Sequence, residues 1–301
     1  MKRAVVAAAL VTVGCSSSVS GQPAPQPQPV PANLAYVDTR ATGDAVAGVK
    51  KAVETAFSYD SAKPDEVTRN EQEYLTGAAR AQFDKTFAEV RTTPVTTQTQ
   101  VLETALAELR PDRAQVLVVA AQHSSRPDGA TNQATAVMLL TAVPAKGHWQ
   151  LQDMNFDPRG QLVSPDGSSL GPASARDTAV AAAHRDGGVL LTVDPQNADA
   201  GYDGWEKVAA EPLLTQFRTD RTQTLDHIRK SGTKATFSPN STAALTDISP
   251  DGTRASALLA ALVTTTGAQQ AERRLPIHLD LVRSGTEWKV SGMKVVAAQG
   301  S

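Results

Sequence analysis

The sequence predicts an α+β protein made of two copies of one small domain. The first indication is an internal repeat: Ala41–Asp60 aligns without a gap with Ala175–Asp194, 134 positions later. The second is that each copy begins with helical periodicity and continues into strand-forming stretches separated by turn residues. A repeat of this length has the size of a domain rather than of a solenoid unit, so we expect two tandem domains.

The repeat extends to the end of each copy. Gln82-Phe83 aligns with Gln216-Phe217 at the same offset, and Trp149–Met154 aligns with Trp288–Met293 at an offset of 139, which a few inserted loop residues explain. Trp149 and Trp288 therefore occupy equivalent positions. We expect both to pack in the cores of their copies as structural markers of the fold.

In copy one the pattern predicts two helical regions followed by strands. Apolar residues at three- and four-residue spacing indicate a helix over Gly43–Ser58, which Asp44 is placed to cap. A second helical region covers Asp65–Val90, and Gly77 breaks or kinks it. Short turns then separate the expected strands, which are Thr96–Leu109, Ala114–Gln122, Thr135–Val143 and His148–Phe156. The pattern of Thr96–Leu109 also fits a helix, and we favour a long strand.

Copy two repeats this plan. The expected helices are residues 175–190 and 203–230, and the expected strands are residues 233–248, 254–264, 274–283 and 286–297. The segment Pro158–Pro172 between the copies is rich in proline, glycine and serine, which indicates a linker. We therefore place copy one at residues 41–157, the linker at 158–173 and copy two at 174–301.

Residues 1–15 have the layout of an export signal. Lys2-Arg3 precede the apolar stretch Ala4–Val13, which is too short to span a bilayer, and Gly14-Cys15 follow. A cysteine in this place resembles the lipobox of bacterial lipoproteins, which implies lipidation of Cys15 and anchoring at the extracytoplasmic face of the cell membrane. The alternative is ordinary secretion with an incidental cysteine. Cys15 is the only cysteine, so no intrachain disulfide is expected.

Residues 16–40 are expected to form a disordered tether. Ser16–Ser20 and the alternating proline and glutamine residues of Gln22–Pro31 cannot bury a core, and such prolines favour an extended polyproline II conformation. The formal net charge of the chain is −2, so nothing indicates a nucleic-acid partner.

Four short segments of copy one resemble the Mce-associated proteins of actinobacteria. They are Tyr59-Asp60 after the first helix, Tyr74–Gly77 with its Thr76-Gly77 at the opening of a later helix, the strand segment Ala114–Val119, and Gly147–Leu151 with its Trp149 at the start of the closing strand. That family resembles the NTF2-like cone fold, in which helices pack in the concave face of a curved antiparallel sheet. The resemblance implies this fold for both copies and association with an Mce-type lipid or sterol importer.

Copy two departs from the motifs of that family. It keeps Trp288 but has Val193 in place of the tyrosine and Ala210-Glu211 in place of the Thr-Gly pair. Family members usually carry one such domain after a transmembrane helix, whereas here two follow an expected lipid anchor. We therefore predict that Tyr59, Asp60, Thr76 and Gly77 of copy one provide the contact with a partner or ligand, and that copy two is mainly a scaffold.

We expect no catalytic site, cofactor or metal. His278-Leu279-Asp280 is the only His-x-Asp sequence on a predicted strand, so both side chains lie on one face. If that face lined the cone, they would suit the acid–base chemistry of an NTF2-like isomerase or hydratase; the alternative is a solvated strand face. The histidines lack metal-ligand spacing, and no nucleotide-binding or nucleophile motif is present.

Two functional hypotheses of different classes remain. The first is a non-catalytic accessory or scaffold protein, anchored in the envelope and bound to an envelope protein complex. The second is a carrier of a small hydrophobic or lipid ligand inside a cone. The sequence argues against a cavity in copy one, because its large apolar side chains are expected to fill it; these are Phe83, Phe87, Met138, Trp149 and Phe156.

Overall fold

The computed structural model describes residues 31–90, 94–160, 171–267 and 270–298. The export signal, Cys15, residues 16–30 of the expected tether and most of the expected linker lie outside these ranges. Pro31–Ser301 form one compact unit, and both copies belong to it. No helix among the described residues is long and apolar enough to cross a membrane.

Copy one has the predicted order of elements, and the break at Gly77 is confirmed. Gly77 has a φ of +53°, a left-handed conformation that favours glycine. The first helix begins earlier than predicted: its cap is Asp38, whose side chain accepts a hydrogen bond from the Ala41 amide at 2.9 Å, and not Asp44. The elements are α1 (Thr39–Ala56), β1 (Tyr59–Asp60), α2 (Pro64–Tyr74), α3 (Gly77–Val90), β2 (Thr96–Arg110), β3 (Arg113–Ser125), β4 (Thr131–Ala145) and β5 (His148–Asn155).

Copy two differs from prediction in three places. Its first helix begins at Gly171, inside the expected linker 158–173. The expected helix over 203–230 is divided, since Pro212 disfavours a helical conformation in the residue before it. The expected strand over 233–248 is interrupted by a turn in which the Ser241 amide donates to the Ser238 carbonyl at 3.0 Å. The elements are α4 (Gly171–Leu190), the 3-10 helix η1 (Pro195–Asn197), α5 (Ala198–Val208), α6 (Leu213–Ser231), β6 (Lys234–Phe237), β7 (Thr242–Ile248), β8 (Arg254–Thr266), β9 (Ala271–Ser284) and β10 (Glu287–Val295).

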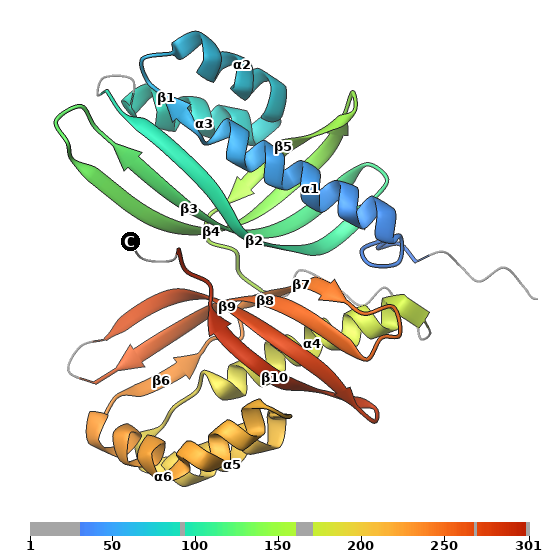
Figure 1. The fold of residues 1–301 in the computed structure, drawn as a ribbon, viewed down its shortest axis with the longest axis vertical. Coiled ribbons are helices and arrows are strands. Elements are labelled where there is room, and N and C mark those ends of the chain that lie inside the picture. Colours follow the sequence, from blue (N-terminus) through green and yellow to red (C-terminus); the bar gives the residue numbers. More distant parts are fainter. Residues whose placement is uncertain (1–30, 91–93, 161–170, 268–269, 299–301) are drawn as a thin grey trace, which may run out of the picture. The chain divides into compact units, whose positions relative to one another are not determined.

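The strands of both copies join one antiparallel sheet in the order β10-β9-β8-β7-β2-β3-β4-β5, with β1 and β6 paired to β2 and β8. In each copy the helices cover the concave face of a curved half of this sheet (Figure 1). The main apolar core lies between the helices and these faces. The predicted α+β class, with helices packed on a curved antiparallel sheet, is confirmed.

Irregularities in strand pairing recur at equivalent places of the two copies. The register between β4 and β5 shifts between Leu151 and Asp153, and the register between β9 and β10 shifts between Val290 and Gly292, 139 positions later. Leu151 and Val290 also form equivalent isolated parallel bridges, to Leu75 directly after α2 and to Ala209 directly after α5. The copies therefore share local geometry as well as element order.

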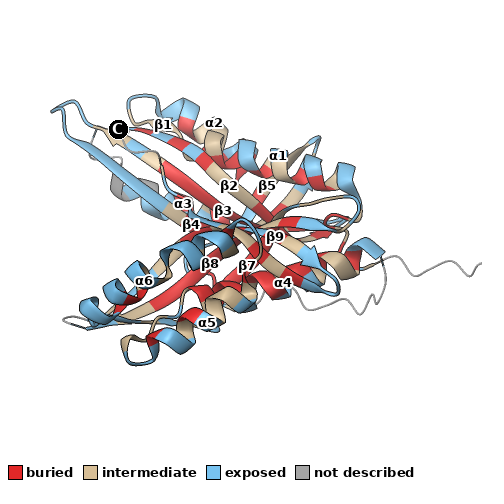
Figure 2. Cartoon of the chain, turned by 60° about the horizontal axis from the view of Figure 1, so that its bottom comes forward, coloured by how far each residue is buried: buried red, intermediate tan, exposed pale blue. Residues whose placement is uncertain are grey.

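The outer faces of the two half-sheets pack against each other (Figure 2). Their apolar contact is a second buried cluster, formed by Ala105, Ala107, Leu117, Val119, Val137, Ala244, Leu258, Ala260 and Val296. At its edge β2 pairs with β7 through Leu106 and Leu245, which are 139 positions apart and hence equivalent. Equivalent residues face each other in this way only around a two-fold axis, so the copies are related here as the subunits of a symmetric dimer.

The expected tether does not extend to residue 40. Asn33, Ala35 and Tyr36 are buried, in a segment that we call the strap (Asn33–Asp38). The Asn33 side chain donates to the Ala107 carbonyl at 2.9 Å and accepts from the Leu109 amide at 2.9 Å, which ties the strap to β2. Composition suggested disorder, but these side-chain hydrogen bonds order the segment.

The strap also contacts copy two. The Tyr36 hydroxyl donates to the Leu245 carbonyl of β7. Arg176 of α4 is 1% exposed, and its Nη1 donates to the carbonyls of Asn33 at 2.7 Å and Ala35 at 3.0 Å. Residues that precede the first helix of copy one are therefore held by both copies.

Candidate functional site

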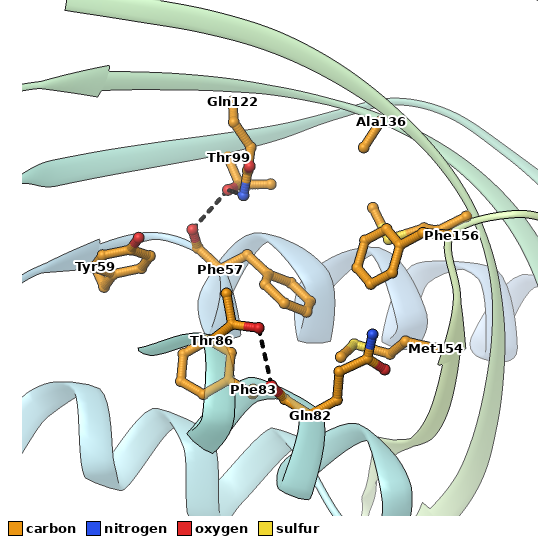
Figure 3. A pocket seen from close by; sticks show the side chains of 11 residues that line it. Phe57, Tyr59, Gln82, Phe83, Thr86, Thr99, Gln122, Ala136, Met154 and Phe156 are labelled. Atoms are coloured by element: carbon orange, nitrogen blue, oxygen red, sulfur yellow. Dashed lines mark hydrogen bonds between the residues drawn. The ribbon is translucent and has the colours of Figure 1, made fainter. Parts of the chain in front are cut away.

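The inside of the copy-one cone contains a cavity of about 260 Å³. It lies between helices α1 and α3 and the concave face of the sheet (Figure 3). Its lining combines aromatic and aliphatic side chains with uncharged polar ones: Phe57, Tyr59, Gln82, Phe83, Thr86, Thr99, Gln122, Ala136, Met138, Met154 and Phe156. Such a combination is typical of sites for small hydrophobic ligands.

Hydrogen bonds fix the polar side of the cavity. Thr99 Oγ1 donates to the Phe57 carbonyl at 2.7 Å, and Gln122 Nε2 donates to Thr99 Oγ1 at 3.2 Å. On the helix side, Thr86 Oγ1 donates to the Gln82 carbonyl at 3.1 Å. The polar lining contains no charged side chain, so the cavity offers neutral hydrogen-bonding groups to an occupant.

The aromatic residues line this cavity and do not fill it, which corrects the expectation from sequence. Phe57 and Phe83 meet edge to face with ring centroids 5.8 Å apart, and Phe156 remains 47% exposed. Trp149 does not line the cavity. Its ring packs against Gly48 of α1 so closely that a Cβ added to Gly48 would lie 2.3 Å from Trp149 Cδ1. The space that Trp149 was expected to fill is therefore left open.

Copy two has apolar residues at the equivalent positions. Strand pairing aligns the Thr99–Gln122 pair of β2 and β3 with the Phe237–Val263 pair of β6 and β8. Phe237 packs over α4, where a Cβ at Gly188 would come within 2.7 Å of its ring. The hydrogen-bonded polar pair of copy one is thus replaced by an apolar pair in copy two.

Of the predicted contact residues, Tyr59 alone lines the cavity. Asp60 closes the turn after β1, where its Oδ1 accepts from the Ala62 amide at 3.0 Å. The Thr76 amide donates to the Leu151 carbonyl at 2.9 Å, and Gly77 gives the left-handed residue at the start of α3. Of these four residues, only Tyr59 is therefore placed to contact an occupant of the cavity.

The equivalent turn of copy two explains part of this pattern. Val193 pairs with Ala235 as Tyr59 pairs with Thr97, and Asp194 Oδ1 accepts from the Gln196 amide at 3.0 Å. Asp60 and Asp194 therefore have the same role, which is to accept a hydrogen bond within the turn that follows. The tyrosine occurs only in the copy that has the cavity lining described above.

The two equivalent tryptophans both pack on the first helix of their copy. Trp288 is 3% exposed, and its Nε1 donates to Thr178 Oγ1 of α4 at 3.1 Å. Trp149 is partly buried and packs against the main core over Gly48. Both positions contribute to helix–sheet packing.

His278 and Asp280 share a strand face, as predicted, but that face does not line a cone. His278 pairs in register with Leu258, which belongs to the cluster between the two copies. Its Nε2 lies 3.2 Å from Asp280 Oδ1, and its Nδ1 lies 2.6 Å from Glu103 Oε1 of copy one. The hydrogen bond to Glu103 raises the pKa of the His278 imidazole, against the effect of its burial. Acid–base chemistry in a cone is therefore not what this pair is placed to do.

Sequence reasoning did not identify Gln82, Thr86, Thr99 and Gln122. One available signal was the alternation of threonine and glutamine from Thr97 to Gln100, which places Thr97 and Thr99 on the inner face of β2. Polar residues at inward strand positions often mark a site rather than a core. In the part of the chain that the structure describes, no group of three or more acidic, histidine or cysteine side chains is arranged to hold a metal ion.

No protein-family model matches the sequence, and no curated protein matches it. Among solved structures, an IcmL-like type IV secretion system protein of Legionella pneumophila is 14% identical over 42% of this chain and 95% of its own, with a TM-score of 0.32. An Ntf2-like protein involved in plasmid conjugation is 12% identical over 85% of this chain and 96% of its own, with a TM-score of 0.28. The intermembrane space region of the chloroplast protein ARC6 is 16% identical over 39% and 95%, with a TM-score of 0.29. At these values the similarities carry no argument about function, which rests on the cavity.

Proposed function

We propose that this protein is a non-catalytic accessory protein of the cell envelope whose first copy binds a small, neutral, largely apolar ligand. The observation that carries the proposal is the copy-one cavity, with apolar walls and the hydrogen-bonded pair Thr99 and Gln122. The apolar pair Phe237 and Val263 of copy two supports it, because only one copy keeps these polar groups. Copy two then acts as a scaffold.

The volume of the cavity limits the size of the ligand. An engineered cavity of about 150 Å³ in another protein binds benzene. A cavity of about 260 Å³ is less than twice that size. We therefore expect a ligand with one or two rings, or a short acyl chain, and not a whole phospholipid enclosed in the cone.

The lining also limits the charge of the ligand. A carboxylate or ammonium group buried without a partner of opposite charge is strongly disfavoured. The lining offers only hydroxyl and amide groups, from Tyr59, Gln82, Thr86, Thr99 and Gln122. An alcohol, ketone, ester or amide group on the ligand fits these partners.

The envelope location and the partner are part of the same proposal. They are supported by the expected lipid anchor at Cys15 and by the resemblance of copy one to Mce-associated proteins, which favours a place beside an Mce-type lipid or sterol importer. Asp60, Thr76 and Gly77 are partly or fully exposed and are available for contact with such a complex. Tyr59 would then link the ligand to that contact.

Ligand binding can be tested by filling the cavity with the side chain that copy two uses. Ala136 lines the cavity, and its equivalent in copy two is Leu275. The protein is purified from its native envelope and examined by native mass spectrometry and by extraction of bound small molecules. We expect a ligand of the stated class in the wild type and its loss in Ala136→Leu.

The matched control is Ala81→Leu, which adds the same side chain at an exposed position of α3. Ala81→Leu should keep the ligand. The proposal that this cavity binds a ligand is wrong if the wild-type protein carries no ligand. It is also wrong if Ala136→Leu folds and retains the wild-type amount of ligand.

The envelope part is tested separately by crosslinking in intact cells. Recovery of importer subunits with the wild type, and release of Cys15→Ala from the membrane fraction, are the expected results. Recovery of no envelope protein would contradict the accessory role, and unchanged membrane retention of Cys15→Ala would contradict the lipid anchor. Neither of these two results would contradict the proposal that the cavity binds a ligand.

A further inference from the structure

The two copies are joined by a partly buried ionisable cluster that the proposed ligand site does not involve. His278 of β9 lies between Glu103 of β2 and Asp280 of its own strand. The His278 and Glu103 side chains are 15% and 14% exposed, whereas Asp280 is 54% exposed. The contact between His278 and Glu103 therefore joins copy two to copy one in a largely buried place.

Both ring nitrogens of His278 face carboxylate oxygens. Nδ1 is 2.6 Å from Glu103 Oε1 and Nε2 is 3.2 Å from Asp280 Oδ1. A carboxylate only accepts hydrogen bonds, and a neutral imidazole has a single N–H to donate. Both contacts are satisfied only when the imidazole carries two protons.

The other groups around His278 do not supply a second donor for Glu103. On β8 the register neighbour is Leu258, and the Ser256 hydroxyl donates to Asp280 Oδ1 at 3.1 Å. On β10 the register neighbour is Lys294, whose side chain is exposed. Further along the same face of β9, Arg274 is paired with Asp157 of copy one.

The cluster also has no symmetric counterpart. The axis through Leu106 and Leu245 relates His278 to Leu139 and Glu103 to Thr242, at the offset of 139 found for these strands. Neither Leu139 nor Thr242 can form an ion pair. The contact is therefore specific to one side of the interface and is not a general requirement of packing the two copies.

We infer that His278 is a proton-dependent latch between the two copies: the doubly protonated imidazole holds β9 to Glu103 of β2, and loss of one proton releases this contact. Since the hydrogen bond to Glu103 raises the pKa of His278 above the ordinary value of about 6.5, the latch stabilises the folded chain fully below about pH 6.5. Its contribution is lost as the pH rises through the pKa of the folded state.

The test compares the full mature chain with two histidine variants. The pKa of His278 is measured by NMR, and the unfolding equilibrium constant is measured by denaturant between pH 5.5 and pH 9. Between pH 5.5 and pH 9, the latch should make the unfolding equilibrium constant of the wild type rise. The rise should be about tenfold for each unit by which the measured pKa of His278 exceeds the pKa of an unfolded histidine. His278→Gln should lack this component, whereas His227→Gln, at an exposed position of α6, should keep it.

A second variant keeps the test decisive if His278→Gln fails to fold. Glu103→Gln replaces the carboxylate by a neutral amide, so it should lower the pKa of His278 and reduce the pH dependence of unfolding. A His278 pKa at or below about 6.5 in the wild type would overturn the latch. So would a wild-type pH profile in His278→Gln, or an unchanged His278 pKa in Glu103→Gln.

Discussion

The contact between Trp149 and Gly48 shows how a single residue distinguishes the two copies. The residue equivalent to Gly48 in copy two is Ala182, 134 positions later, on the helix that packs against Trp288. In copy one the tryptophan ring lies so close to α1 that a Cβ at position 48 would be 2.3 Å from Cδ1 and 3.0 Å from Cγ. Glycine at this position therefore allows the close approach of the tryptophan.

We predict that Gly48→Ala destabilises the protein. Overpacking a well-packed core costs about 1–3 kcal/mol, and the better helix propensity of alanine offsets up to about 1 kcal/mol of this. Gly43→Ala in the same helix is the matched control, because nothing lies within 4 Å of its added Cβ. In denaturant unfolding the control should be neutral or more stable than wild type. Equal stability of both variants would contradict the Trp149 contact.

At the scale of elements, strand β8 is buried on both faces. Leu259 points into the main core, and its neighbour Leu258 points into the cluster between the copies; both are 0% exposed. A sheet covered by helices on one side alone would leave one of these leucines in water. Packing of the two copies covers the second side.

We therefore predict that Leu258→Ala and Leu259→Ala cost similar free energies of unfolding, about 2–5 kcal/mol each. Val295→Ala, at a position that is 60% exposed, should change stability by no more than about 0.5 kcal/mol. Urea unfolding of the three variants provides the measurement. A Leu258→Ala variant as stable as the Val295→Ala control would show that the copies do not pack through this face in solution.

The sequence contained part of this information. The run from Ala257 to Val263 is continuously apolar, a pattern of strands covered on both faces, while helix periodicity and turn residues predicted the order of most elements. The sequence did not predict which element covers the outer face of β8. An apolar pattern indicates that a strand is buried, but it does not identify the element that packs against it. The strap was missed because its order depends on hydrogen bonds to distant backbone groups.

The cavity was missed for a different physical reason. Counting large apolar residues such as Phe83 and Phe156 predicted a filled cone, but an open volume depends on where those side chains point. Trp149 was assigned to the cavity and lies instead against α1. The size of a cavity is a small difference between large volumes, and composition does not determine it.

At the scale of the whole described unit, Arg176 connects the start of one copy to the first helix of the other. It is 1% exposed, donates to two carbonyls of the strap, and its Nε lies 2.7 Å from Asp177 Oδ1. Copy one by itself would lack this arginine and would expose the outer face of its sheet. Binding experiments on this protein therefore require the full chain.

We predict that Arg176→Ala costs about 3–5 kcal/mol, because it leaves buried polar partners without their donor. Both copies should lose stability together in one transition, since the strap contacts both. Arg218→Ala is the control: that side chain is 62% exposed and lies 3.9 Å from Glu206, an arrangement worth at most about 1 kcal/mol. Circular dichroism and tryptophan fluorescence should report the same midpoint. Separate transitions for the two copies would contradict this coupling.

The pairing of Leu106 with Leu245 has a consequence for how this chain can change. In a homodimer encoded by one gene, each substitution enters both subunits and appears twice across the axis. In this chain the two copies are encoded by separate stretches of one gene. A substitution therefore changes one copy and leaves the equivalent position of the other copy unchanged. Thr99 can remain polar while Phe237 is apolar, and His278 can face Glu103 while Leu139 faces no acid. Fusion of the two copies thus permits one of them to specialise while the other preserves the shared fold.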